Sequence, residues 1–482
     1  MMAENPQPPN SPSGVDQLLL TASDHFGHGR LSEAEEICTA ALQTAPNHIR
    51  ALHLLAMIAH QTNQTERAVG LLVHAIEVEP KAAGLHLDLG VLCQQSGRIN
   101  EAIQAYTNAA GLAPDNADIY FNLGTAHGSL GQGKEAIAAY GRAIEIDPGY
   151  ARAYRNKATL HLAMDDPEAA LPLSEKASEL LPDDAQSIAD HGRALLKLER
   201  GAEAVVAFSR AVELVPSAPR MHIHVGYAHL VDGNPSAALE AIEKGLALSP
   251  GDTLGLAIKA LALVENGDRE QAAPLLDFEK LVRARKFSTP AGYGSINEFN
   301  EALVEHITSH PSLRFSESNR SVTASQGTGD LLVEPLGPFE AFGQMVGTAV
   351  QEYIDTVCAG IDHPSLAHPP ARWRPSVWAT VMHSSGQQFS HFHPPGWLSG
   401  VYYPTLPTLM SEDDPERAGW IEFGPPYPRI PLKAEFDVTA YRPEEGMMFL
   451  FPSYACHQTV PFVSDEKRVS IAFDILPLRD TP

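Results

Sequence analysis

The chain has 482 residues, 44 % of them hydrophobic and 19 % charged, and a formal net charge of −25 at pH 7. This length is too great for one ordinary core, so we expect two or more domains. The negative charge argues against nucleic acid and anionic membrane as partners, because binding to either requires a basic face. No apolar run in the sequence approaches the roughly 20 residues that span a bilayer.

Residues 1–14 lack the basic start and apolar stretch of a secretory signal, and we interpret them as a short disordered lead. The cysteines are few and widely scattered, which argues against a disulfide framework or a structural zinc site. They are Cys38, Cys93, Cys358 and Cys456. Together these features predict a cytoplasmic protein.

The first half of the chain repeats with a period of 34 residues. Prolines mark the period at Pro46, Pro80, Pro114, Pro148, Pro182, Pro216 and Pro250. Ten residues after each proline stands an alanine or a glycine, and twelve residues before each stands an alanine. This register predicts a helix–turn–helix solenoid, in which small residues lie where two helices cross and proline ends the second helix.

The period and its pattern resemble tetratricopeptide repeats over residues 15–286, with a degenerate last unit from Leu256 to Lys286. The resemblance implies an all-α superhelix whose concave face binds a protein or peptide. The alternative for the same repeats is a spacer or a dimerisation scaffold.

Residues 287–482 have a different pattern. Helical spacing begins at Ile296 and again at Pro338, and the polar stretch LRFSESNRSVTASQGTGDLL between these helices is predicted as an extended loop. From Pro375 onward, eight short β-type runs are separated by glycine and proline. This order predicts a double-stranded β-helix, or jelly roll, with flanking helices.

Three histidines of this second domain suggest a metal site. His391 and His393 stand at i and i+2, so both face the same side of a strand and can reach one metal ion. His457 closes a later strand-like run and would supply a third ligand. The competing interpretation is that each histidine is an ordinary hydrogen-bonded side chain.

Arg468 and Ser470 also share one strand face. A buried guanidinium is a bidentate receptor for a carboxylate, and a serine hydroxyl adds one more donor. An internal salt bridge of Arg468 is the alternative.

The strings HxHPxGWLSGVYY, FPSYACH and RVSIAFD resemble the Fe(II)/2-oxoglutarate-dependent oxygenases, and their order is similar to that in the aspartyl/asparaginyl β-hydroxylases. The resemblance implies Fe(II) as the metal cofactor, 2-oxoglutarate and O2 as cosubstrates, and hydroxylation of a C–H bond. It implies metal binding by His391, His393 and His457, and binding of the distal carboxylate of 2-oxoglutarate at Arg468 and Ser470. It makes His391, His457 and Arg468 the expected catalytic residues.

This sequence departs from the usual family pattern at one ligand. The usual set is two histidines and one carboxylate, with His-x-Asp or His-x-Glu at the first pair, whereas this chain has His393 there. Either three imidazoles bind the metal, or His391 and His457 bind it with water. Glu422 is a candidate substitute carboxylate, although we favour an exposed strand position for it.

Tyr402 and Tyr403 follow on the next strand and point to opposite faces. We expect Tyr403, which shares a face with Ser399, to face the interior and bind 2-oxoglutarate, and Tyr402 to pack in the core. Thr380 is a further candidate for cosubstrate binding.

These observations predict an Fe(II)- and 2-oxoglutarate-dependent dioxygenase that hydroxylates a residue of a protein or peptide recruited by the repeats. One alternative is a cupin-like three-histidine metalloenzyme that acts on a small molecule; it would not need the receptor formed by Arg468 and Ser470. The other is a non-catalytic repeat adaptor.

Overall fold

The computed structural model describes residues 12–316, 322–333, 335–411 and 414–478, and it divides into two compact units, Met1–Pro182 and Asp183–Pro482. Residues 1–11 of the predicted disordered lead lie outside the described residues, and the first helix begins at Pro12. None of the helices in these ranges is both long enough and apolar enough to cross a bilayer.

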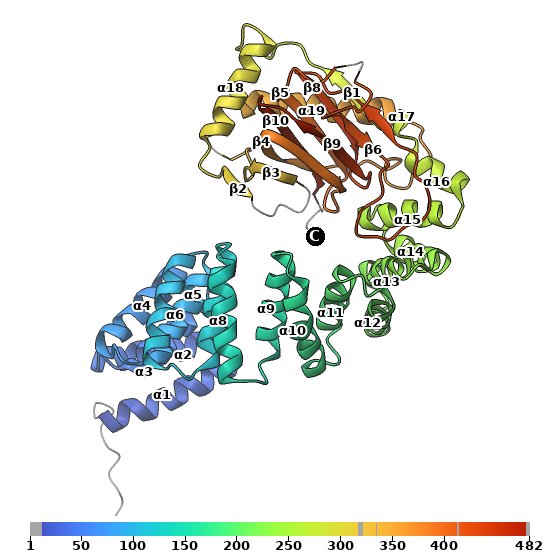
Figure 1. Ribbon diagram of the computed structural model, residues 1–482. Helices are drawn as coiled ribbons and strands as arrows, with labels where there is room; N and C mark the ends of the chain where they lie inside the picture. The colour runs from blue at the N-terminus through green and yellow to red at the C-terminus, as the bar shows by residue number, and fades with distance from the viewer. Residues whose placement is uncertain (1–11, 317–321, 334, 412–413, 479–482) are drawn as a thin grey trace, which may run out of the picture. The chain divides into compact units, whose positions relative to one another are not determined.

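The first unit consists of helices, as the 34-residue period predicts. Successive helices form antiparallel pairs joined by short turns (Figure 1). Their bounds are α1 (Pro12–Gly27), α2 (Leu31–Thr44), α3 (Ile49–Gln61), α4 (Thr65–Val78), α5 (Ala83–Gln95), α6 (Ile99–Leu112), α7 (Ala117–Ser129), α8 (Gly133–Ile146), α9 (Ala151–Ala163) and α10 (Pro167–Leu180).

The second unit begins with further helices of the same array. They are α11 (Ala185–Lys197), α12 (Gly201–Leu214), α13 (Pro219–Val231), α14 (Pro235–Leu248), α15 (Thr253–Glu265), α16 (Arg269–Leu276) and α17 (Phe278–Leu281). The prediction of an all-α solenoid in the first half of the chain is therefore confirmed.

In each repeat, the small residue of the first helix lies against a side chain of the second helix. A Cβ atom added to Gly124 would lie 2.8 Å from the ring of Tyr140, and one added to Gly90 would lie 2.4 Å from the ring of Tyr106. Close packing against these two rings thus explains why glycine stands at both positions.

We expect Gly124→Ala to destabilise the repeats by about 1–3 kcal/mol, because the buried ring of Tyr140 has no room for the added methyl group. Gly128→Ala is the matched control: it lies on the same helix, and a Cβ there would meet no atom within 4 Å. Urea denaturation followed by circular dichroism measures both changes. Equal midpoints for the two variants would contradict this account of the packing.

An antiparallel sheet follows the helices of the second unit. Its strands are β1 (Arg283–Lys286), β2 (Arg314–Ser316), β3 (Val322–Gly327), β4 (Trp373–His391), β5 (Leu398–Thr405), β6 (Ile421–Phe423), β7 (Thr439–Tyr441), β8 (Met447–Pro452), β9 (His457–Val463) and β10 (Arg468–Pro477). The main path runs β1-β8-β5-β10-β4-β9-β6-β7, and β3 joins both β2 and β4. This arrangement is consistent with the predicted jelly roll.

Two details of the sheet differ from the sequence prediction. Two predicted strands form one long strand, β4, whose pairing with β9 shifts register near Gln388. The polar stretch predicted as a loop contributes β2 and β3 instead. These strands pair through backbone hydrogen bonds beside β4, and such pairing does not require apolar side chains.

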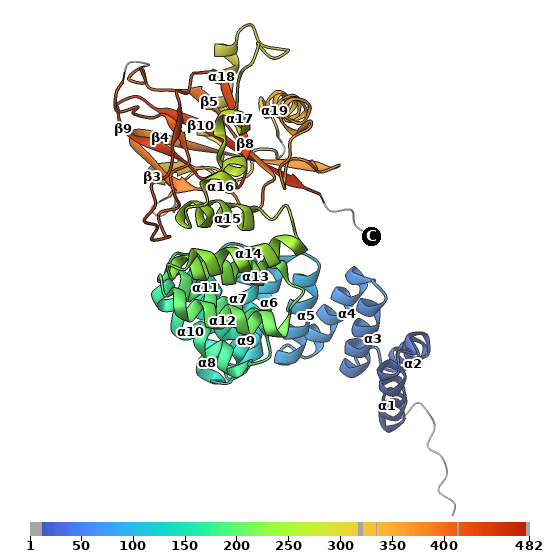
Figure 2. The same ribbon diagram turned by 90° about the vertical axis from the view of Figure 1, so that its right-hand side faces the viewer.

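Two helices cover one face of the sheet (Figure 1; Figure 2). They are α18 (Ile296–Ser309) and α19 (Phe339–Tyr353), and a π-helical turn, η1 (Ile354–Cys358), continues α19. Phe299 and Phe342 of these helices share a core with Val469, Ile471 and Phe473 of β10. Because side chains alternate along a strand, the even-numbered residues of β10 face the opposite side, where the cavity lies.

Candidate functional site

A cavity of about 340 Å³ opens on the sheet face opposite α18 and α19. Even-numbered residues of β10 line one wall, and residues of β4, β5 and β9 line the others. The predicted site residues that line it are Thr380, His391, His393, Tyr403, His457, Arg468 and Ser470. The fold thus brings together side chains that are nearly ninety residues apart in the sequence.

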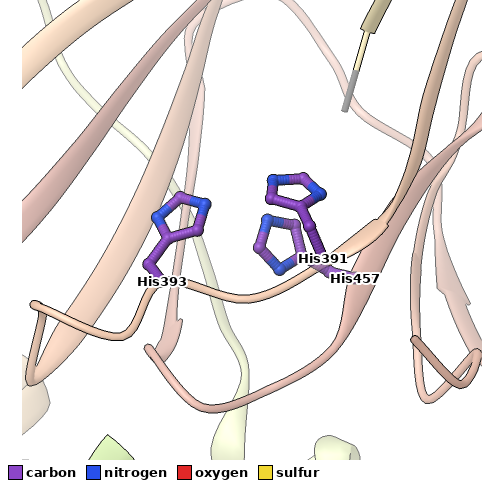
Figure 3. Close-up of side chains that lie close together, drawn as sticks. All are labelled: His391, His393 and His457. Atoms are coloured by element: carbon purple, nitrogen blue, oxygen red, sulfur yellow. The ribbon is translucent and has the colours of Figure 1, made fainter. Parts of the chain in front are cut away.

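Three imidazoles come together in this cavity (Figure 3). His391 ends β4 and is the register partner of His457, which begins β9, and His393 follows two residues after His391. The ring centroids of His391 and His457 are 4.3 Å apart, and the ring of His393 lies 5.1 Å from each of them. One ligand nitrogen from each ring lies within 4.8 Å of the others, which fits binding of a single metal ion.

Hydrogen bonds hold the three rings by their Nδ1 atoms. The Nδ1–H of His391 donates to the carbonyl of Phe389 at 2.8 Å, and that of His457 donates to the carbonyl of Ala455 at 3.0 Å. Nδ1 of His393 bonds the carboxylate of Asp474 at 2.6 Å. An imidazole that carries its proton on Nδ1 presents the lone pair of Nε2 to a metal.

Burial keeps two of the rings neutral. Desolvation, with a smaller contribution from His393, lowers the pKa of His391 to about 3. Desolvation also lowers the pKa of His457 well below its usual value, and the other two histidines add to this effect. Both imidazoles are therefore unprotonated at neutral pH, which is the state that binds a metal.

Asp474 is a site residue that the sequence analysis missed. Its carboxylate accepts hydrogen bonds from Nδ1 of His393 at 2.6 Å and from the hydroxyl of Ser399, also at 2.6 Å. Asp474 is 7 % exposed and lies on the same strand face as Arg468 and Ser470. An acidic residue in the otherwise apolar run RVSIAFDI, in phase with Arg468, was the signal that could have identified it.

Arg468 carries a buried positive charge that has no ion-pair partner among the described residues. Its side chain is 1 % exposed, and its Nε atom has no hydrogen-bond partner. One long hydrogen bond of 3.4 Å reaches Thr459, and the ring of Tyr403 lies 5.1 Å from the guanidinium carbon. Burial lowers the pKa of Arg468, and such a charge is costly unless an anion accompanies it.

The two tyrosines lie on opposite faces of β5. Tyr403 lines the cavity beside Arg468, and its burial raises its pKa. Tyr402 packs in the core and donates a hydrogen bond of 2.6 Å to Asn300. Glu422 accepts a hydrogen bond of 2.8 Å from Gln458 and does not line the cavity.

Comparisons with known proteins match segments in both halves of the chain. Residues 376–474 match the family described as "Putative 2OG-Fe(II) oxygenase". Models of tetratricopeptide repeats match residues 25–87, 92–131, 117–150 and 189–253. The chain therefore carries tetratricopeptide repeats and a domain of this oxygenase family, as the sequence predicted. No curated protein matches it.

Among solved structures, similar chains include YrrB, described as a TPR protein with an unusual peptide-binding site. It is 23 % identical over 39 % of this chain and 98 % of YrrB, with a TM-score of 0.38. MamA from Desulfovibrio magneticus RS-1 is 23 % identical over 34 % of this chain and 94 % of MamA, with a TM-score of 0.33. The pilF protein of Pseudomonas aeruginosa is 21 % identical over 44 % of this chain and 96 % of its own, with a TM-score of 0.38.

Proposed function

We propose that the chain is an Fe(II)- and 2-oxoglutarate-dependent dioxygenase that hydroxylates a residue of a protein or peptide recruited by its repeats. One observation carries this proposal. Three imidazoles whose ligand nitrogens lie within 4.8 Å of one another line the same cavity as a buried arginine that has no ion pair among the described residues. The three imidazoles fit a metal ion, and the arginine fits the carboxylate of an acid that binds beside the metal.

The three histidines would hold the metal as neutral ligands. Because none of them brings a negative charge, the site keeps the full charge of the divalent ion and favours an anionic cosubstrate. The carboxylate of Asp474 bonds Nδ1 of His393 at 2.6 Å and so fixes the orientation of that ring. When bound, Fe(II) with 2-oxoglutarate and O2 supplies the oxidising power for C–H hydroxylation.

Arg468 would bind the distal carboxylate of 2-oxoglutarate. Its planar guanidinium offers paired donors, and the hydroxyl groups of Ser470, Tyr403 and Thr380 line the same cavity. Apolar side chains, among them Phe451 and Ile421, form part of the wall. They limit water around the reacting groups, which strengthens each electrostatic contact.

Titration of Mn(II)-loaded protein with 2-oxoglutarate, followed by calorimetry, tests the proposal directly. We expect binding that depends on the metal, together with slow succinate formation when Fe(II) replaces Mn(II). Absence of 2-oxoglutarate binding in the presence of either metal would refute the proposed function.

We expect His391→Ala and His457→Ala each to weaken Mn(II) binding by about 10- to 100-fold, because each removes one of three ligands. His383→Ala is the matched control, since His383 lies on the same strand but outside the cavity, where it bonds Gln326. Calorimetry measures the affinity of each variant. Unchanged affinity in both ligand variants would show that the metal does not bind at this cluster.

The cupin-like alternative is less well supported, because its chemistry does not require a carboxylate receptor such as the buried Arg468. The state of the cysteines supports a cytoplasmic location, which we propose as well. All four are free and buried thiols, and burial raises the pKa of Cys38 and Cys358 to about 11. Unpaired thiols are usual in a reducing compartment.

A further inference from the structure

We propose that the side-chain amide of Gln388 has two binding partners in turn. In the metal-free protein it holds the ligand nitrogen of His391, and in the metal-loaded protein it binds the carboxylate of 2-oxoglutarate that lies nearer the metal. Gln388 is on β4 and lines the metal cavity, and the sequence analysis assigned no role to it. The second part of the proposal rests on the proposed function, because it adds a residue that binds the cosubstrate.

The contact between Gln388 and His391 has a defined direction. Nε2 of Gln388 lies 3.2 Å from Nε2 of His391. Nδ1 of the same imidazole lies 2.8 Å from the carbonyl oxygen of Phe389, which can only accept, so Nδ1 carries the ring proton. Burial, which lowers the pKa of His391 to about 3, keeps the ring neutral. Its Nε2 atom therefore has a lone pair and no proton, and the amide of Gln388 is the donor.

This hydrogen bond and a metal compete for the same lone pair. A neutral imidazole with its proton on Nδ1 has one lone pair in the plane of the ring, so Nε2 of His391 cannot accept from Gln388 and bind a metal at the same time. The backbone of Gln388 pairs with Val322 of β3 on one side and with Thr459 of β9 on the other. A metal that binds His391 would therefore displace only the side chain of Gln388, and its amide would stay in the cavity.

The position of Gln388 in the cavity indicates its second partner. Thr459 is the cross-strand neighbour of Gln388 and lines the same cavity, and its hydroxyl accepts a hydrogen bond of 3.4 Å from the guanidinium of Arg468. One wall of the cavity thus carries His391, Gln388, Thr459 and Arg468. A dicarboxylic acid with its distal carboxylate on Arg468 and its other carboxylate toward the metal would lie beside this wall.

The exchange of partners favours the complex with the acid. A hydrogen bond to a charged carboxylate is stronger than one to a neutral imidazole, so the amide of Gln388 gains when the acid replaces the ring as its acceptor. The same amide opposes metal binding in the absence of the acid, because its bond to His391 has to break first. Gln388 would thus weaken the binding of the metal alone and strengthen the binding of the acid to the metal-loaded protein.

Two calorimetric titrations of the full chain with the variant Gln388→Leu test this proposal. The first adds Mn(II) to the metal-free protein, and the second adds 2-oxoglutarate to protein saturated with Mn(II). Leucine cannot donate a hydrogen bond, so we expect Mn(II) to bind about three- to fivefold more tightly than in the unmodified protein and 2-oxoglutarate to bind about tenfold more weakly. General damage to the site would weaken the binding of both, whereas loss of this amide changes the two affinities in opposite directions.

Gln387→Leu is the matched control, because Gln387 is the neighbouring glutamine of β4, is half-buried as well, and does not line the cavity. We expect both of its affinities to stay unchanged, and circular dichroism checks that each variant is folded.

Mn(II) affinity that is unchanged or lower in Gln388→Leu would overturn the proposal, and so would unchanged affinity for 2-oxoglutarate, even though binding to the unmodified protein would support the proposed function. If 2-oxoglutarate does not bind the unmodified protein, the proposed function fails together with the second role of Gln388, and the Mn(II) titration still decides the first.

Discussion

Replacing Arg468 by methionine is expected to weaken 2-oxoglutarate binding to the Mn(II)-loaded protein by about 100-fold. A bidentate, charge-assisted contact in a buried site contributes about 3 kcal/mol, which corresponds to this factor. Methionine has a similar length and no charge, so the cavity wall is kept. Calorimetric titration with 2-oxoglutarate measures the change.

Two controls separate this role from a structural one. Mn(II) affinity should stay the same, because the three histidines do not depend on Arg468. The thermal stability of the protein without ligands should stay equal or rise, because the variant removes a buried charge that has no ion pair among the described residues. A large fall in stability with unchanged 2-oxoglutarate affinity would instead support the internal salt bridge.

Replacing Asp474 by asparagine is expected to weaken Mn(II) binding by about 10- to 100-fold. The amide of asparagine can donate to Nδ1 of His393, which would move the imidazole proton to Nε2 and block the ligand atom. Ser399→Ala is the milder comparison, since it removes one donor to Asp474 but keeps the bond between Asp474 and His393.

A double-mutant cycle shows whether Asp474 acts through His393. In a His393→Ala background, Asp474→Asn should change Mn(II) affinity little, because the ligand that Asp474 positions is already absent. An equal loss of affinity in both backgrounds would contradict this role and would assign Asp474 to the metal or to the fold directly.

The repeats could be predicted in detail because their signal is periodic and local. A period of 34 residues fixes where each helix crosses its neighbour, and Ala102 and Ala136 are fully buried at the predicted positions. Alternation along a strand likewise indicated that Arg468 and Ser470 lie together.

The contacts between strands could not be predicted in this way. The bond between Asp474 and His393 joins residues 81 positions apart and depends on the pairing of Asp474 with Ser399 across β10 and β5. That pairing shifts register between Val469 and Ile471. A sequence pattern indicates which residues of a strand share a face, but it does not indicate how neighbouring strands are aligned. The hydrogen-bond partner of His393 was therefore found only in the structure.

The position of β10 has a consequence for biosynthesis. This strand lies between β5 and β4 in the middle of the sheet, yet every other strand of the sheet precedes it in the chain. The repeats depend on local contacts and can fold during translation, whereas the sheet must wait for its central strand. β10 also carries Arg468, Ser470 and Asp474. A chain that stops before Arg468 would therefore keep the sequence of the repeats but lack the central strand of the sheet and these three site residues.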